Sequence, residues 1–185
     1  MPGASLEALT GRLGVGAIAF LGLFLIVDGF QVGAFEMIEL YGKSATWGIV
    51  GVVPTAVVIY IVGVFCVGLA EMILAPFPRL RRPAVEDLMV VSQSAATLAQ
   101  QSYAEQVRNH ELLKGAAVSF VILALGSLVD SSNLFGFEPL AWIGVIGSVA
   151  LSVLSLVFSQ RAVAQAHSLA NAVRACESRP RNGAA

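Results

Sequence analysis

The sequence predicts an all-α integral membrane protein in which four transmembrane helices form two hairpins. Of its 185 residues, 57% are hydrophobic and only 12% are charged, about half the charged share of an average soluble domain. Its mean hydropathy is +0.80. Four apolar stretches are long enough for the roughly 20 residues that a helix needs to cross a bilayer. So few charges cannot solvate a globule of this size, so lipid must cover part of its surface.

The four apolar stretches come in two pairs, and each pair predicts one hairpin. The spans run from about Leu13 to Phe35, from Trp47 to Leu74, from Gly115 to Phe135 and from Leu140 to Ser159. We therefore expect one transmembrane hairpin over residues 13–75 and another over residues 115–160. The run Val32-Gly33-Ala34 is also compatible with a signal-peptide cleavage site. Asp28 interrupts the apolar run before that site and favours a span.

The remaining segments are polar. Ala84–Lys114 lacks Gly and Pro and is rich in Ala, Gln, Leu and Glu, which predicts helix within the polar segment 76–114. A straight helix of this length would be about 45 Å long, so we expect either a break near Gln101–Ala104 or a segment that lies partly along the membrane. The fourth span should continue into a tail helix over 161–177 that packs against the middle segment. Residues 178–185 should be disordered.

The distribution of Lys and Arg predicts the orientation. Basic residues gather in the middle segment and the tail: Arg79, Arg81, Arg82, Arg108, Lys114, Arg161, Arg174, Arg179 and Arg181. Lys43 is the basic residue of the two hairpin loops. By the positive-inside rule, residues 1–12, the middle segment and the tail lie in the cytoplasm. The abundance of Ala, Gly, Val and Arg suggests a bacterial inner membrane, and Arg79, Arg81 and Arg82 would face lipid headgroups.

A short motif occurs twice without a gap. Val27-Asp28 is followed by Phe35-Glu36, and Val129-Asp130 is followed by Phe137-Glu138 at the same spacing. Both motifs lie at the outer ends of outward-going spans, as expected for parallel repeats. Duplicated ion-facing carboxylates and chance coincidence of four residues are both open interpretations.

Asp28 is the most informative candidate because it lies about two-thirds of the way across the first span. A carboxylate at that depth is costly unless it is paired, hydrated or protonated. Ion or proton handling and a structural residue hydrated from outside are equally supported. Asp130 and Glu71 are further ion-handling candidates, but both suit structural roles better. Asp130 precedes a polar run, and Glu71 can pair with Arg79 or Arg161.

Small residues mark where helices approach closely in a membrane, because lipid provides no hydrophobic drive between them. The candidates are Gly29 and Gly33 in the first span, and Gly144, Ser148 and Ser152 in the fourth. Packing within the chain is the favoured interpretation, and a subunit interface is the alternative.

The chain offers few groups for chemistry. It contains no Walker loop or dinucleotide fingerprint, and the in-span serines lack a nearby base. We expect His110 and His167 to be solvated surface residues. Cys66 and Cys176 should not form a disulfide, since one lies in a span and the other in the tail. We expect no catalytic residue, metal or cofactor, and the net charge of −1 gives no reason to expect nucleic-acid binding.

Three functions remain. The favoured one is a non-catalytic multi-pass inner-membrane subunit that oligomerises, or that anchors or scaffolds a membrane complex, including a sensor or defence component. Its partners would be membrane lipid, further copies or other membrane subunits, and a cytoplasmic protein bound through 84–114 and 161–177. The alternative is a small oligomeric ion or proton channel, or an ion-coupled transporter, that uses Asp28. An enzyme of lipid or quinone chemistry is least favoured.

Overall fold

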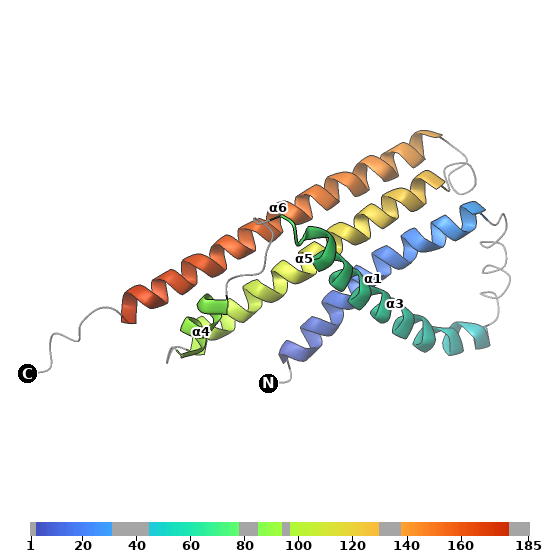
Figure 1. The fold of residues 1–185 in the computed structure, drawn as a ribbon. Helices are drawn as coiled ribbons and strands as arrows, with labels where there is room; N and C mark the ends of the chain where they lie inside the picture. Colours follow the sequence, from blue (N-terminus) through green and yellow to red (C-terminus); the bar gives the residue numbers. More distant parts are fainter. Residues whose placement is uncertain (1–2, 31–44, 78–84, 94–96, 130–137, 178–185) are drawn as a thin grey trace, which may run out of the picture.

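The structure, a computed structural model, describes residues 3–30, 45–77, 85–93, 97–129 and 138–177. This part of the chain is helical and contains no strand (Figure 1). Its helices are α1 (Gly3–Phe30), α3 (Ala45–Leu74), α4 (Val85–Gln93), α5 (Thr97–Val129) and α6 (Glu138–Glu177). Residues of interest that lie outside the described part are Gly33, Arg79, Arg81, Arg82, Asp130 and the tail 178–185. Half of each copy of the repeated motif lies there too, since Phe35, Glu36, Asp130 and Phe137 are not described.

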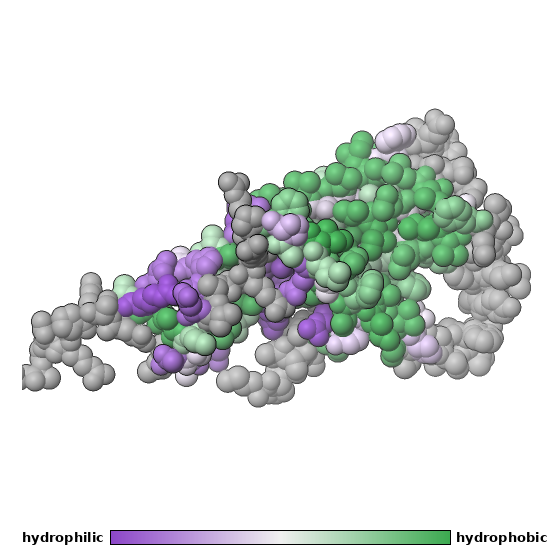
Figure 2. Space-filling model, viewed as in Figure 1, coloured by the Kyte–Doolittle hydropathy of each residue, from purple (hydrophilic) through white to green (hydrophobic). Residues whose placement is uncertain are grey.

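Four of the helices are long and apolar enough to cross a membrane. Each contains an apolar window of sufficient length, and the helical stretches concerned are Leu9–Phe30, Pro54–Leu74, Thr97–Val129 and Trp142–Cys176. Figure 2 shows that apolar side chains cover one half of the molecule, and that hydrophilic side chains gather over α4 and the last part of α6. We call these the apolar half and the polar half. The all-α architecture with four long apolar helices is as predicted.

Helices α5 and α6 lie side by side and antiparallel through both halves (Figure 1). Their contacts recur every seven residues on both helices: Tyr103 with Ala166, His110 with Ser159, and Ala117 with Ser152. A seven-residue repeat is typical of two helices that cross at a shallow angle and stay in contact over a long distance.

The side of α6 that faces this contact is made of small residues. The buried positions are spaced by three or four: Ser148, Ser152, Ser155, Ser159, Ala162, Ala166 and Ala170. We call this row the small-residue seam. In the apolar half two of its serines donate to backbone carbonyls: Ser152 Oγ to Ala117 O of α5 at 3.0 Å, and Ser155 Oγ to Leu151 O of α6 itself at 2.8 Å. In the polar half alanines continue the row, so one contact surface joins the span to the tail.

Helix α1 packs parallel to α5 through glycines. A Cβ atom on Gly126 would lie 2.3 Å from Gly22 O, and one on Gly29 would lie 2.8 Å from the Val129 side chain. Any side chain at the Gly22 and Gly126 contact would therefore push the two backbones apart. The shared direction of α1 and α5 agrees with the orientation that the repeated motif implies.

Helix α3 crosses α1 at a second glycine contact. A Cβ atom on Gly16 would lie 1.8 Å from Ile59 O, and one on Gly63 would lie 2.0 Å from Arg12 O. Before this crossing α3 diverges from the other helices (Figure 1), and its side chains Val52, Val57 and Val58 are exposed. The first helix pair therefore touches mainly at one crossing, unlike the long contact between α5 and α6.

In the polar half, the tail helix is as predicted, but the predicted break is wrong. α6 runs without interruption from Glu138 to Glu177 and packs against α4 and α5. α5 is helical throughout 101–104, and residues 94–96, between α4 and α5, lie outside the described part. Tyr103 explains the difference, because it is buried in a cluster with Val91, Ala166 and Ala170 that holds this turn of α5 against α6.

Candidate functional site

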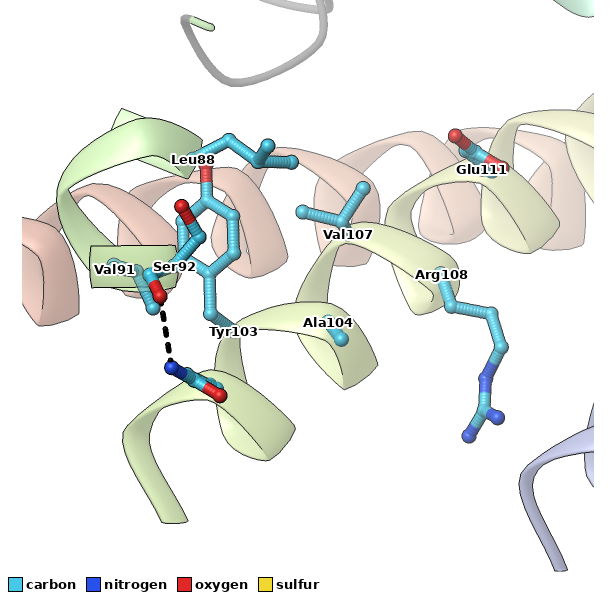
Figure 3. A pocket seen from close by; sticks show the side chains of 9 residues that line it. Leu88, Val91, Ser92, Tyr103, Ala104, Val107, Arg108 and Glu111 are labelled. Atoms are coloured by element: carbon cyan, nitrogen blue, oxygen red, sulfur yellow. Dashed lines mark hydrogen bonds between the residues drawn. The ribbon is translucent and has the colours of Figure 1, made fainter. Parts of the chain in front are cut away.

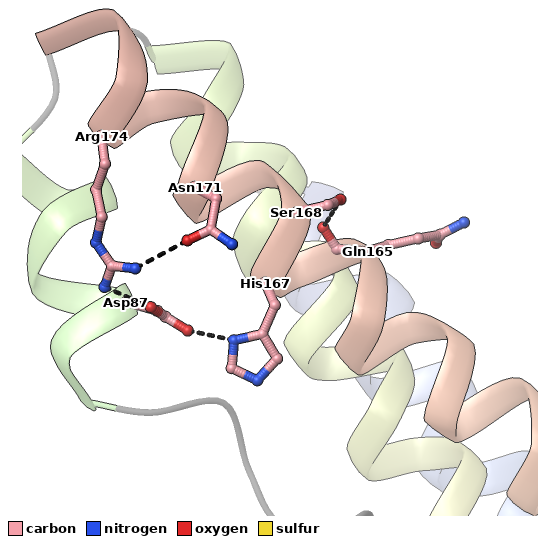
Figure 4. Close-up of polar contacts among 6 residues, drawn as sticks. All are labelled: Asp87, Gln165, His167, Ser168, Asn171 and Arg174. Atoms are coloured by element: carbon pink, nitrogen blue, oxygen red, sulfur yellow. Dashed lines mark hydrogen bonds and ion pairs between the residues drawn. The ribbon is translucent and has the colours of Figure 1, made fainter. Parts of the chain in front are cut away.

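The polar half contains a buried carboxylate that joins α4 to α6 (Figure 4). Asp87 is only 4% exposed. Arg174 Nη2 donates to Asp87 Oδ1 at 2.6 Å, and His167 Nδ1 lies 2.5 Å from Asp87 Oδ2. Arg174 Nη1 also donates to Asn171 Oδ1 at 3.0 Å, which orients the guanidinium. These contacts fix the short helix α4 on the surface of α6.

Tyr103 lies next to this carboxylate. Its side chain is buried, and its hydroxyl has no hydrogen-bond partner among the described residues. Burial raises the pKa of the Tyr103 phenol, the nearby Asp87 carboxylate raises it further, and the Arg174 guanidinium acts in the opposite direction. The phenol is therefore held in its neutral form.

An open groove of about 370 Å³ runs between α4 and α5 (Figure 3). Its lining is mainly apolar near α4 and charged toward the apolar half of the molecule, and consists of Leu88, Val91, Ser92, Gln100, Tyr103, Ala104, Val107, Arg108 and Glu111. Gln100 Nε2 donates to Ser92 O at 3.0 Å across one end. We call this the α4–α5 groove. It lies on the segment that the sequence assigned to a protein partner.

His110 is fully buried, so the prediction that it is a solvated surface residue is wrong. Ser159 Oγ lies 2.7 Å from His110 Nδ1, and both side chains are 0% exposed. A serine hydrogen-bonded to a histidine is the arrangement used in nucleophilic catalysis. Here no substrate can reach the pair between α5 and α6, so its effect is to connect the two helices. His167, at 47% side-chain exposure, agrees better with the prediction.

One turn closer to the apolar half, a lysine is buried beside α3. Lys114 is 3% exposed, and its Nζ lies 3.9 Å from Glu71 Oε1. The sequence suggested Arg79 or Arg161 as partners for Glu71. Arg79 lies outside the described residues, and Arg161 lies over the Phe158 ring at 5.6 Å from its centroid. The contact between Lys114 and Glu71 ties α5 to α3 where the polar half begins.

A second open groove, of about 600 Å³, lies over α5 between α1 and α6. It is lined by Val15, Gln106, Asn109, Leu112, Leu113, Ala116, Phe158, Arg161, Ala162 and Gln165. We call this the α5–α6 groove. Arg161 is the charged residue in this lining, whereas the α4–α5 groove contains both Arg108 and Glu111.

The candidate residues of the apolar half lie apart from these features. Asp28 is 4% exposed in the last turn of α1, next to Gly29, which packs against Val129. Ser148 and Ser152 are buried in the small-residue seam, and a Cβ atom on Gly144 would lie 3.5 Å from Ser127 Oγ. Cys66 is buried, Cys176 is exposed, and both are free thiols. Within the described residues, no group of three His, Cys, Asp or Glu side chains is placed to hold a metal.

Sequence reasoning missed Asp87, Tyr103, His110 and Lys114 as interior residues. The sequence contains one indication for two of these residues. Tyr103 and His110 are seven residues apart, and residues of α5 that contact α6 recur at that spacing. Asp87 carries no such signal, since its partners lie about 80 or more residues away in the tail.

We compared the chain with protein-family models, with curated proteins and with solved structures. None of the three comparisons found a match.

Proposed function

We propose that the chain is a non-catalytic multi-pass subunit of a bacterial inner membrane that oligomerises or anchors a membrane complex. Both ends would lie in the cytoplasm, as would the polar half. A helical surface made by α4, α5 and α6 would then be held at a fixed position below the bilayer and offered to a protein partner.

The observation that carries this proposal is the continuity of α5 and α6 through both halves. At 1.5 Å per residue, they are about 50 Å and 60 Å long, against about 30 Å for the hydrocarbon core. The small-residue seam keeps them in contact along this length. Where the surface changes from apolar to polar, His110–Ser159 connects α5 to α6, and Lys114–Glu71 connects α5 to α3. Such a rigid extension suits an anchor or scaffold.

The reactive groups also favour a non-catalytic role. Ser159 and His110 are closed off from solvent, and Asp87 is buried against Arg174 and His167. These polar groups hold helices together, and none of them combines a nucleophile, a base and an accessible cavity.

The channel alternative is less well supported. A pore built between copies would require Asp28 to face outward, but its side chain is enclosed within one chain. The outward-facing residues of the spans are large and apolar, among them Leu23, Phe65, Ile146 and Val153. This surface suits contact with lipid or with other membrane helices.

The test is the mass of the protein extracted from its native membrane in a mild detergent, together with the identity of co-purifying proteins. We expect a complex larger than the 19.3 kDa chain. Asp87→Ala should reduce any cytoplasmic partner in the complex by loosening α4, while Glu105→Ala, at an exposed site in the same half, should not. A single chain with no companion protein would contradict the proposal.

A flux measurement separates the channel alternative. The purified chain in liposomes should show background ion and proton flux, with no change in Asp28→Asn. Flux clearly above background that disappears in Asp28→Asn would instead establish the channel.

A further inference from the structure

We propose that the α5–α6 groove binds one anionic glycerophospholipid, with its phosphate at Arg161 and its acyl chains directed along the apolar half. This inference rests on the membrane insertion proposed above. It goes beyond general contact with lipid, since it assigns a defined site with a preference for headgroup charge.

The first argument is that the lining changes polarity at one level on both helices. The buried pair His110–Ser159 marks that level. On its polar side the groove is lined by Asn109 and Arg161, and on its apolar side by Leu113 and Phe158. A phospholipid has the same division, a polar headgroup above apolar chains, and in a bilayer it lies at this depth.

The second argument is the kind of polar group in the lining. Arg161 provides a guanidinium, and Gln106, Asn109 and Gln165 provide amides that can donate hydrogen bonds. No carboxylate lines this groove or pairs with Arg161 among the described residues. A phosphate diester has only acceptors to offer, and the unneutralised positive charge favours a lipid whose net charge is negative.

The third argument is the position of Arg161. Its guanidinium lies over the Phe158 ring, 5.6 Å from the centroid. This cation–π contact holds the guanidinium toward the apolar side of the groove, where phosphates of the cytoplasmic leaflet would be. The apolar part of the groove has a second wall formed by Val15 and by the half-buried Leu112. Leu112 contacts Gly11 of α1.

The other groove provides a matched control. Arg108 and Arg161 lie at about the same depth, because α5 and α6 are antiparallel in the register that pairs His110 with Ser159. Arg108 lines the α4–α5 groove together with Glu111, so a positive and a negative charge occur there together. Removing Arg108 changes the total charge by the same amount as removing Arg161 but leaves the proposed site intact.

The test uses the purified full chain in a mild neutral detergent and native mass spectrometry. Phosphatidylglycerol and phosphatidylcholine with identical acyl chains are added at equal concentrations. The unmodified chain should retain one phosphatidylglycerol in preference to phosphatidylcholine by about fivefold, the effect of one arginine near a phosphate. Arg161→Gln should abolish the preference, and both Arg161→Lys and Arg108→Gln should keep it. Circular dichroism checks that helical content is the same in every variant.

Four results would overturn the inference. These are no preference in the unmodified chain, equal losses in Arg161→Gln and Arg108→Gln, loss of the preference in Arg161→Lys, and displacement of the lipid by glycerol 3-phosphate at the lipid's concentration. The last would indicate a site for a free anion. The same spectra report the mass of the assembly, which separates the two proposals. A single chain that prefers phosphatidylglycerol and has no companion protein in the native-membrane extract contradicts only the proposed function, and an oligomer or complex without preference contradicts only the lipid site.

Discussion

At the scale of single residues, the Tyr103 hydroxyl is a buried polar group with no partner among the described residues. Burying a hydroxyl without a hydrogen bond costs free energy, whereas the ring contributes apolar contact in the cluster with Val91 and Ala166. We therefore expect Tyr103→Phe to leave the free energy of unfolding unchanged or to raise it by up to about 1 kcal/mol. Denaturant unfolding in detergent micelles, followed by circular dichroism, measures this. A loss of stability would show that the hydroxyl has a partner after all.

The raised pKa of Tyr103 also gives stability a dependence on pH in the alkaline range. The folded chain holds the phenol proton more tightly than the unfolded chain does, for which the pKa is about 10. The stabilising contribution is therefore complete below about pH 10 and is lost as the pH rises through the higher pKa of the folded state. Between about pH 9 and about pH 11, the melting temperature of the unmodified chain should fall more than that of Tyr103→Phe. Equal falls would contradict the shift.

Asp87 supplies the polar attachment of α4 to α6. Both of its partners are nearly half exposed, at 42% for Arg174 and 47% for His167. Water replaces part of the lost attraction at such sites, so Asp87→Ala should cost only about 1 kcal/mol of global stability. Its local effect should be larger, with faster amide hydrogen exchange in Val85–Gln93. Glu86→Ala, at the exposed neighbouring position, is the control, and equally fast exchange in both variants would count against the attachment.

At the scale of elements, two kinds of contact hold the helices together. α1 meets α3 and α5 through backbone contacts at glycines, and α5 meets α6 through the small-residue seam. The seam changes from serine to alanine where the surroundings become polar. In the apolar half Ser152 gains a hydrogen bond to a carbonyl of α5, and in the polar half the alanines gain from apolar burial.

Gly14 and Gly16 of α1 allow two effects of a glycine-to-alanine substitution to be compared, the loss of close helix contact and the change in helix propensity. A Cβ atom on Gly16 would lie 1.8 Å from Ile59 O, whereas one on Gly14 would meet nothing within 4 Å. We expect Gly16→Ala to lower the unfolding free energy by about 1–3 kcal/mol, because the backbones of α1 and α3 must separate. Gly14→Ala should be neutral or stabilising by up to about 1 kcal/mol. Thermal unfolding in detergent compares the pair, and similar effects at both positions would argue against the crossing.

At the scale of the whole molecule, the two cysteines report on orientation without any substitution. Cys176 is exposed near the end of α6, and Cys66 is buried among α1 and α3 residues. A membrane-impermeant maleimide should label Cys176 in inside-out vesicles but not in intact spheroplasts. Cys66 should react only after denaturation. Labelling of Cys176 from the outer face would reverse the orientation and would remove the proposed cytoplasmic partner.

Much of the architecture follows from local properties of the chain. Apolar runs of sufficient length predict the four long helices, and the helical period of Val163, Ala166, Ala170 and Val173 predicts that the fourth helix extends to about Cys176. These features depend on residues close together in the sequence, since a helix satisfies its own backbone hydrogen bonds.

The sequence by itself therefore determined that the protein is all-helical and that four helices have the length and composition of membrane spans. It also determined that polar helical segments follow the second and the fourth span. Only the tertiary structure decided that His110 and Asp87 are interior residues, that α3 diverges from the other helices before its crossing with α1, and that α5 runs through the predicted break. Each of these depends on which distant helix lies opposite. A hydrogen bond such as that between Arg174 and Asp87 forms across a long stretch of chain, and no local period or propensity encodes it.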